Sequence, residues 1–417
     1  MSPPARDPAL APFRVRSFRF QWPADLAASW AFEMETLILG WYVLTETGSV
    51  LLLTLFASLQ YAGTLLSPLI GVAGHRLGNK RVFCAMRGFY LLLASMLAAL
   101  ALTEELQPMH VFLITALMGL VRPSDLVMRH ALIGETLPVT QFVGAASISR
   151  TTQDSARVMG ALTGAGLVAA LGVGFAYLVV MVFYLSSLLL TLGVSSARVA
   201  DRAQATVGAT TVVQDLQEGL LHVWRTPPLQ AAIWLALLVN LTAFPLVNGL
   251  LPYVARSVYG TDQTGLGYMV AGFAGGALIG SLWLTRFGHA IKPARTMVGG
   301  CVLWYGLTLL FVQMESLAAG VAMLLLAGLA QSLGMVAMAA LLLRCSEPRF
   351  RSRVMGVRML AIYTLPVGLM LSGPLIGHFG FHVMGSAYCI VGLLLTLWIA
   401  WHWRAALWDA RAQANRP

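Results

Sequence analysis

Apolar residues run along this chain in stretches of about 20, and short clusters of charged or turn-forming residues separate one stretch from the next. A helix of about 20 apolar residues is long enough to cross a hydrocarbon layer about 30 Å thick. The pattern therefore predicts twelve transmembrane helices, near residues 20–44, 50–72, 82–102, 109–133, 143–171, 174–195, 230–255, 265–285, 295–313, 317–343, 354–377 and 381–403.

The composition supports a membrane protein. The chain is 58% hydrophobic and 11% charged, whereas a soluble domain has roughly 25% charged residues. Its four cysteines are scattered, without a CxxC pair, so we expect neither a disulfide framework nor a metal site.

The basic residues are distributed unevenly between the loops. They gather in both tails and in alternate loops, whereas the opposite loops are mainly acidic and contain a single basic residue, Arg256. Because positively charged loops remain in the cytoplasm, both termini are expected there, in a protein that crosses the bacterial cytoplasmic (inner) membrane many times. The net charge of +10 then reflects topology, and no nucleic acid partner is expected.

The order of the predicted spans divides the chain into two halves. The predicted order is a cytoplasmic tail (1–19), a six-helix half (20–195), a cytoplasmic linker (196–230), a second six-helix half (231–403) and a tail (404–417). The linker stretch "VVQDLQEGLLHVWRTPPLQ" has apolar residues at helical spacing and predicts an amphipathic helix. Paired halves with a site between them are typical of secondary transporters. The expected fold class is an all-α membrane protein, a monomer with twelve transmembrane helices in two halves around a central cavity.

Several motifs in the correct order give a resemblance to a known superfamily. "GVAGHRLGNKRVF" is similar to the cytoplasmic loop motif of the major facilitator superfamily, with His75 where that motif usually has an acid. "METLILGWYVLTETGS", "DLVMRHAL" and "EPRFRSRVMGVRMLA" resemble the branch of enterobactin-type siderophore exporters and macrolide-type efflux proteins. The resemblance implies a twelve-helix transporter. It also implies gating or structural roles for these residues: Gly71, His75, Arg76, Gly78, Lys80, Arg353 and Arg358.

Charged residues inside the first-half spans are the main functional candidates. An ionised side chain at mid-membrane costs on the order of 3 kcal/mol, so each needs a partner, a wet cavity or a function. The fourth and fifth spans carry matched Arg-Asp-Arg ladders, read from their cytoplasmic ends: Arg129, Asp125, Arg122 and Arg150, Asp154, Arg157. Three or four residues is the interval that stacks side chains on one helix face.

Two interpretations of the ladders remain open. The outer residues Asp125, Arg129, Arg150 and Asp154 can pair internally and hold the helical hairpin together. The deepest arginines, Arg122 foremost with Arg157, are candidates for contact with the substrate or for coupling.

The first span supplies the candidate proton carriers, Glu33 and Glu35. They lie two residues apart and cannot share a helix face. A carboxyl group buried in a membrane can bind and release protons near neutral pH, and a nearby arginine modulates this exchange. Either acid could act opposite Arg122, and Glu33 is preferred because its face carries small and polar residues. The alternative is that either acid hydrogen-bonds a neighbouring span.

The second half offers polar and pliant residues. Asn240 and Asn248 in the seventh span and Gln331 and Met335 in the tenth are substrate-binding candidates, because those spans line the cavity in proteins of this resemblance. As single residues of this kind more often serve packing than contact with a substrate, packing is the alternative. Glycines at four-residue spacing, such as Gly272, Gly276 and Gly280, predict close helix approach.

Enzyme motifs are missing: the chain has no HExxH, GxSxG or phosphate loop. We therefore expect neither an enzyme nor a cofactor nor nucleotide binding, and transport energy must come from an ion gradient. The leading hypothesis is a proton-driven exporter of a small molecule, siderophore-like or drug-like, with an anionic type favoured by the ladders. The alternatives are an importer or uncoupled facilitator of the same fold and, from another class, a membrane sensor or enzyme.

Overall fold

The computed structural model describes residues 11–64, 70, 74, 76–138, 141–195, 212–287, 291–347 and 350–408. These residues are almost entirely helical, without a strand among them. Up to residue 195 the elements are η1 (Ala11–Arg14), α1 (Arg16–Thr47), α2 (Val50–Leu59), α4 (Asn79–Leu102), α5 (Pro108–Val121), η3 (Arg122–Ser124), α6 (Asp125–Thr136) and α7 (Phe142–Leu192).

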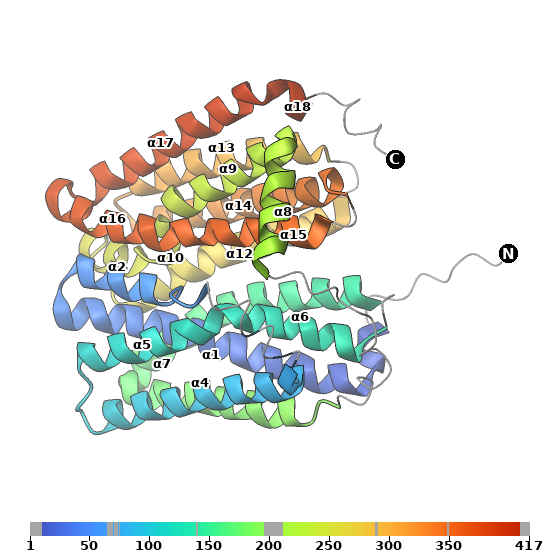
Figure 1. Ribbon diagram of the computed structural model, residues 1–417. Coiled ribbons are helices and arrows are strands. Elements are labelled where there is room, and N and C mark those ends of the chain that lie inside the picture. The colour runs from blue at the N-terminus through green and yellow to red at the C-terminus, as the bar shows by residue number, and fades with distance from the viewer. Residues whose placement is uncertain are drawn as a thin grey trace. The chain divides into compact units, whose positions relative to one another are not determined.

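From residue 212 the elements are α8 (Val212–Arg225), α9 (Pro227–Thr242), α10 (Phe244–Asn248), α11 (Leu251–Tyr253), η5 (Val254–Val258, a π-helix), α12 (Gln263–Phe287), α13 (Pro293–Val312), α14 (Leu317–Cys345), α15 (Arg351–Leu360), η8 (Ala361–Tyr363), α16 (Thr364–Phe379), α17 (Phe381–His402) and α18 (Arg404–Trp408) (Figure 1). Helix therefore covers every predicted span, although the second span lies only partly within the described residues.

The helix α7 is two predicted spans in one element. Its 51 residues would extend about 77 Å if straight, more than twice the thickness of a membrane core. Gly172 interrupts it with φ 80° and ψ 174°, a conformation that glycine adopts readily because it has no Cβ. The break coincides with the boundary predicted between the fifth and sixth spans.

Eight helical stretches of the described residues are long and apolar enough to cross a membrane. One of these, Ile148–Leu192, contains both spans of α7, and two shorter apolar helices, Val50–Leu59 and Pro227–Thr242, belong to further predicted spans. The acidic residues of α1 lower its hydropathy, which explains why α1 is outside this set.

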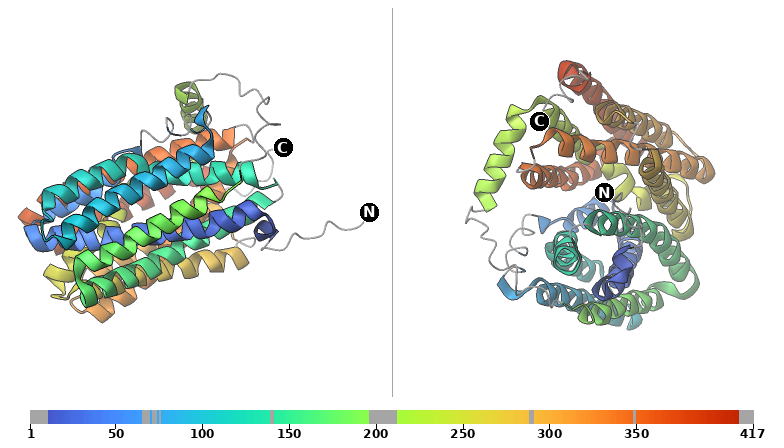
Figure 2. Two further views of the ribbon diagram at one scale, coloured as in Figure 1. Left: turned by 90° about the horizontal axis from the view of Figure 1, so that it is seen from below. Right: turned by 90° about the vertical axis from the view of Figure 1, so that its right-hand side faces the viewer.

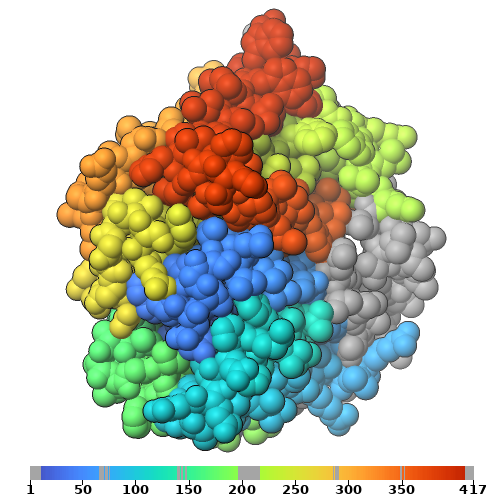
Figure 3. Space-filling view, turned by 90° about the vertical axis from the view of Figure 1, so that its left-hand side faces the viewer, coloured from blue at the N-terminus to red at the C-terminus, as the bar shows by residue number. Residues whose placement is uncertain are grey.

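The chain divides into two compact units. We call residues 1–39 with 59–208 the first unit and residues 40–58 with 209–417 the second unit. The outer end of α1 and most of α2 therefore pack with the second unit. The Arg256 guanidinium donates a hydrogen bond to the Leu44 carbonyl over 2.6 Å, and in Figure 3 the blue surface of this segment lies beside the yellow surface of η5 and the start of α12.

In the first unit, side chains from several helices hold α1. The indole nitrogens of Trp22 and Trp30 donate to Thr152 and Thr163 of α7, and the Ser187 hydroxyl donates to the Ala24 carbonyl. The right-hand view of Figure 2 looks nearly along these helices. The central place of α1 puts its acidic residues within reach of α4, η3, α6 and α7.

The second unit packs through close backbone contacts. A Cβ added at Gly276 of α12 would collide with the Leu325 carbonyl oxygen of α14, and one added at Gly328 of α14 would collide with the Phe273 carbonyl oxygen. The predicted role of Gly276 in close helix approach is therefore confirmed. The predicted amphipathic linker helix is α8, which packs on α15, where Arg353 forms an ion pair with Glu218. Residues 196–211 of the linker lie outside the described residues.

Candidate functional site

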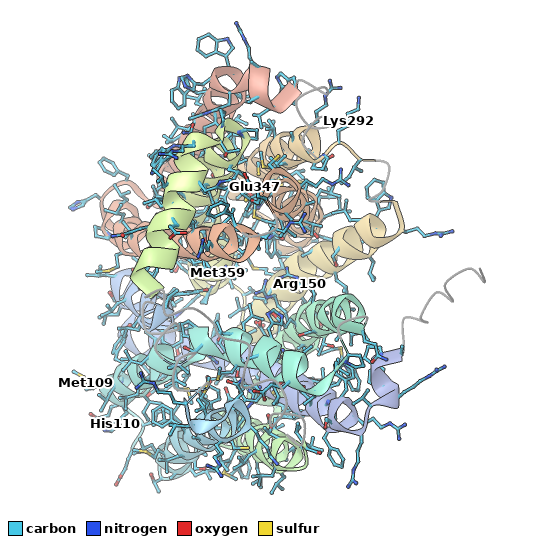
Figure 4. The ribbon with its side chains drawn as sticks, turned by 45° about the vertical axis from the view of Figure 1, so that its right-hand side comes forward. Met109, His110, Arg150, Lys292, Glu347 and Met359 are labelled. Carbon is cyan, nitrogen blue, oxygen red and sulfur yellow. The ribbon has the colours of Figure 1, made fainter. Side chains whose placement is uncertain are left out.

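A pocket of about 220 Å³ opens within the first unit. Its walls come from α1, α4, η3, α6 and both segments of α7. The charged side chains that line it are Glu33, Arg87, Arg122, Asp125, Arg129, Arg150, Asp154 and Arg157. Figure 4 shows the side chains of these helices and labels Arg150. Most of the charged candidates from the sequence thus surround one cavity.

Arg122 lies at a break in the fourth span. Pro123 follows it, and because proline cannot donate the next helical hydrogen bond, α5 ends and a 3-10 turn begins. The Arg122 guanidinium donates to the Glu35 carboxylate over 3.0 Å and to the Gln60 side-chain oxygen over 3.3 Å. It also lies 3.1 Å from the centre of the Phe32 ring. Arg122 is therefore held by Glu35 and Phe32 of α1 and by Gln60, which follows α2.

Glu35 is the most enclosed acid of the pocket region, with 2% of its side chain exposed. Besides Arg122, the Tyr184 and Tyr177 hydroxyls donate to its two oxygens over 2.9 and 3.2 Å. These tyrosines lie two helical turns apart on the segment of α7 after Gly172, so both face the same side. Desolvation favours a protonated carboxyl group, whereas the guanidinium and phenol donors favour the carboxylate. Such opposed influences suit a group that exchanges a proton.

Glu33 has a different partner. Its carboxylate lies 3.4 Å from the Arg157 Nε, with 16% of the Glu33 side chain and 37% of the Arg157 side chain exposed. Gly160 makes this approach possible, because a Cβ there would lie 2.7 Å from the Glu33 Cβ. The face of α1 that carries small and polar residues predicted Glu33 as the acid opposite Arg122. The structure places Glu35 there instead, because Glu33 faces the fifth span.

A four-charge cluster lies beside these pairs, and it joins α1, α4 and α6. Arg87 contacts Asp25 and Asp125 over 3.1 Å each, and Arg129 contacts Asp125 over 3.0 Å and Asp25 over 3.5 Å. Arg129 also donates to the Ser29 hydroxyl. Two acids and two bases balance, which reduces the cost of burying them.

The ladders are only partly self-contained. Their outer residues pair within each helix, Asp125 with Arg129 and Arg150 with Asp154. The deepest arginines, Arg122 and Arg157, instead pair with the acids of α1. Among the described residues no ion pair joins one ladder to the other.

Sequence reasoning missed four contributors: Arg87, Gln60, Tyr177 and Tyr184. Arg87 carried a usable signal, since it is an ionised residue inside an apolar span. The two tyrosines and Gln60 carried none, because uncharged polar residues are common in such helices. Counting all ion pairs, five arginines (87, 122, 129, 150, 157) face five acids (25, 33, 35, 125, 154), so the region is neutral as a whole.

The second-half candidates lie in the second unit. Asn240 on α9 donates to the Ala236 carbonyl of its own helix. Gln331 on α14 is buried, and Asn248 and Met335 are half-buried. The pocket described above is lined by the first unit alone, so a substrate role for these residues stays a prediction.

Only some of the predicted gating residues lie among the described residues. Gly71 and His75 lie outside the described residues. Gly78 precedes α4 with φ 93°, and exposed Arg76 stands just before it. Lys80 donates to the Leu192 carbonyl at the end of α7 over 2.8 Å, while Arg353 and Arg358 lie on α15. A gating role for this set stays a prediction.

The fold is that of membrane transporters. The chain is similar to a bacterial homolog of the human lysosomal transporter Spinster, solved inward-facing and unoccupied, with a TM-score of 0.74 and 12% identity over 95% of this chain and 98% of that one. It is also similar to a D-xylose–proton symporter, with a TM-score of 0.69 and 13% identity over 92% and 97% of the two chains. A nucleoside transporter gives 0.69 and 13% over 93% and 99%. At these identities the likeness shows the fold alone, and the predicted all-α membrane fold with twelve transmembrane helices is confirmed.

The protein is thus a multi-pass transporter of the major facilitator superfamily and not an enzyme. Within that superfamily, residues 7–416 match the model of the family described as transmembrane secretion effector, and the chain belongs to this family. No curated protein sequence matches the chain.

Proposed function

We propose that this transporter exports a small molecule in exchange for protons by alternating access. The observation that supports this most strongly is the environment of Glu35, a carboxyl group enclosed by Arg122, Tyr177 and Tyr184. Two of these partners, Arg122 and Tyr184, line the charged pocket, and Glu35 lies behind them. The family description as a secretion effector agrees with export.

The two acids of α1 would have different tasks. Glu35 is nearly inaccessible and is the better proton carrier, because its charge state is set by protein groups that can be rearranged. Glu33 and Arg157 are more exposed to the pocket, so a substrate entering it reaches this pair first. A substrate in the pocket would separate Arg157 from Glu33. Because Glu35 lies two residues further along α1, this separation would also affect Glu35.

The substrate is proposed to be a siderophore-like or drug-like molecule. Arg150 and Arg157 line the pocket and are partly exposed, which suits an anionic substituent. The neutral total of the ion-pair region weakens the case for a strongly anionic substrate that the ladders alone suggested. We further propose a monomer in the bacterial cytoplasmic membrane with both termini in the cytoplasm, on the basis of the loop charges.

Everted membrane vesicles test the proposal. Vesicles containing the full chain are acidified inside by respiration, and a siderophore and a macrolide are added in turn while a fluorescent dye reports the pH gradient. The expected result is accumulation of one class of compound together with proton efflux. Glu35→Gln should abolish gradient-driven accumulation yet preserve substrate counterflow, because a neutral side chain mimics only the protonated state.

The alternatives give distinct results. Counterflow in the wild type without accumulation under either pH gradient identifies a facilitator, and accumulation only with the opposite gradient identifies an importer. Full proton coupling in the Glu33→Gln/Glu35→Gln double variant would exclude both glutamates as the coupling groups.

A further inference from the structure

Tryptophan and arginine occur together at one end of the second unit. Helix α17 ends at His402, the chain turns at Trp403, and the short helix α18 follows. Four helices carry the residues that we call the Trp–Arg corner: Trp224 and Arg225 at the end of α8, Arg295 in the first turn of α13, Trp401 on α17, and Arg404 and Trp408 on α18.

Side-chain contacts join these segments. The Trp403 indole donates to the Gln230 side-chain oxygen of α9 over 3.0 Å, and Gln230 donates in turn to the Trp224 carbonyl of α8. Leu407 of α18 is buried. Helix α18 packs against α9 and α13. These contacts make the corner an ordered part of the fold. Figure 4 labels Lys292, which directly precedes α13.

Two arginines of the corner lie over indole rings. The Arg404 guanidinium is 5.6 Å from the Trp401 ring centre, and the Arg295 guanidinium is 5.8 Å from that of Trp408. A guanidinium that lies over an aromatic ring contacts the ring through its planar face. The N–H donors at the edge of the guanidinium therefore remain available to oxygen acceptors. These arginines are held in place and still able to bind an anion.

Polarity rises along α17 towards this corner. The exposed residues Val391, Leu394 and Leu397 are aliphatic, Trp401 follows with 62% exposed, and Arg404 comes next. From the aliphatic residues to Arg404, this order matches the layers of one bilayer leaflet, from the acyl chains through the interface to the headgroups. It places Arg404 at the depth of lipid phosphates when the apolar residues lie in the hydrocarbon.

Acids are few in the described helices of the corner: α8 carries Asp215 and Glu218, of which Glu218 pairs with Arg353. Helices α9, α13, α17 and α18 contain no aspartate or glutamate. Among the described residues no carboxylate pairs with Arg225, Arg295 or Arg404. A surface with fixed positive charge beside exposed indole rings complements a negatively charged interface.

We propose that the Trp–Arg corner is a binding site for the headgroup of an anionic phospholipid. Arg295 and Arg404 donate to the phosphate oxygens, and Trp401 and Trp408 lie at the level of the glycerol backbone. Basic pockets between transmembrane helices are suited to such headgroups. A zwitterionic lipid is a poorer partner, because its ammonium group meets the same arginines.

Native mass spectrometry of the full chain in detergent tests this site. The protein is titrated with phosphatidylglycerol or with phosphatidylcholine of identical acyl chains, and bound lipid is counted. The wild type should retain phosphatidylglycerol in preference. Arg295→Gln/Arg404→Gln should weaken its retention by about five-fold for each arginine removed, from a contribution of about 1 kcal/mol per basic residue near an anionic surface.

Matched variants control for charge and folding. Arg76→Gln removes an exposed arginine of the first unit and should leave retention unchanged, and Arg295→Lys/Arg404→Lys keeps the charge and should preserve most of the preference. Each variant must elute and melt as the wild type does. Equal retention of the two lipids by the wild type, or an unaltered preference in Arg295→Gln/Arg404→Gln, would overturn the proposal.

Discussion

The interiors of the two units differ in how many charged side chains they contain. The first unit encloses a network of arginines and acids around α1, in which Arg87 has 1% of its side chain exposed. Close glycine contacts occur in both units, at Gly63 and Gly119 in the first and at Gly276 and Gly328 in the second. The units differ in charge, because the buried charged side chains of the described residues all lie in the first unit. An ion pair of the second unit, Arg353 with Glu218, lies near its surface.

This difference indicates that the charged groups needed for proton chemistry lie in the first unit. Buried charges are costly, and a protein of marginal stability retains them where they are fully paired or functional. Backbone contacts over glycine carry no charge, so a substitution there acts through side-chain volume. We therefore expect proton chemistry to depend on the first unit, and the second unit to be sensitive to side-chain size.

The largest effect is expected from Arg87→Leu. This change leaves the buried Asp25 and the half-buried Asp125 without one of their partners, and removal of one member of a buried ionic cluster costs about 3–5 kcal/mol. Thermal unfolding of the purified chain in detergent should show a large drop in the midpoint. In Arg87→Gln/Asp25→Asn charge balance returns, and stability should recover in part. An Arg87→Leu protein as stable as the wild type would contradict the structural role of this cluster.

The second unit should respond to volume instead. Gly276→Ala places a methyl group against the Leu325 carbonyl oxygen, and overpacking of this kind costs about 1–3 kcal/mol. Gly299→Ala on α13 is the matched control, because a Cβ there meets nothing within 4 Å and helix propensity favours alanine. The two variants should shift the unfolding midpoint in opposite directions, and equal shifts would show that helix approach at Gly276 is not tight.

A hydroxyl deletion separates the proton site from general packing. Tyr184→Phe removes a donor to Glu35, and one hydrogen bond to a charged group corresponds to about a ten-fold change, so gradient-driven transport in vesicles should slow by about that factor. Tyr90→Phe is the control: Tyr90 is buried against Tyr184, and its hydroxyl has no hydrogen-bond partner among the described residues. If both variants transport equally, the hydrogen bond to Glu35 does not serve coupling.

The helical pattern was predictable because membrane helices obey a simple rule of length and polarity. The break at Gly172 fell between two apolar runs, and the break at Pro123 followed from the chemistry of proline. The amphipathic linker helix was likewise readable from its spacing. These features depend on residues close together along the chain.

The partners of the charged residues were not predictable in the same way. Spacing shows that Glu33 and Glu35 face different directions, but the rotation of α1 decides which one meets Arg122. That rotation is set by contacts from distant segments, including Gly160 and Ser187. Arg87 binds Asp25 across 62 positions of sequence, a pairing that local periodicity does not contain.

The smallest effect is expected from Glu218→Gln on the linker helix α8. About half of the Glu218 side chain is exposed, so water and the retained amide replace most of what the carboxylate gives to Arg353, and exposed ion pairs contribute about 0–1 kcal/mol. The unfolding midpoint should therefore stay near that of the wild type in low salt, and added salt should erase the remaining difference. A loss approaching that of Arg87→Leu would mean that charge matters as much in the second unit as in the first, because burial is the physical basis for ranking the two pairs.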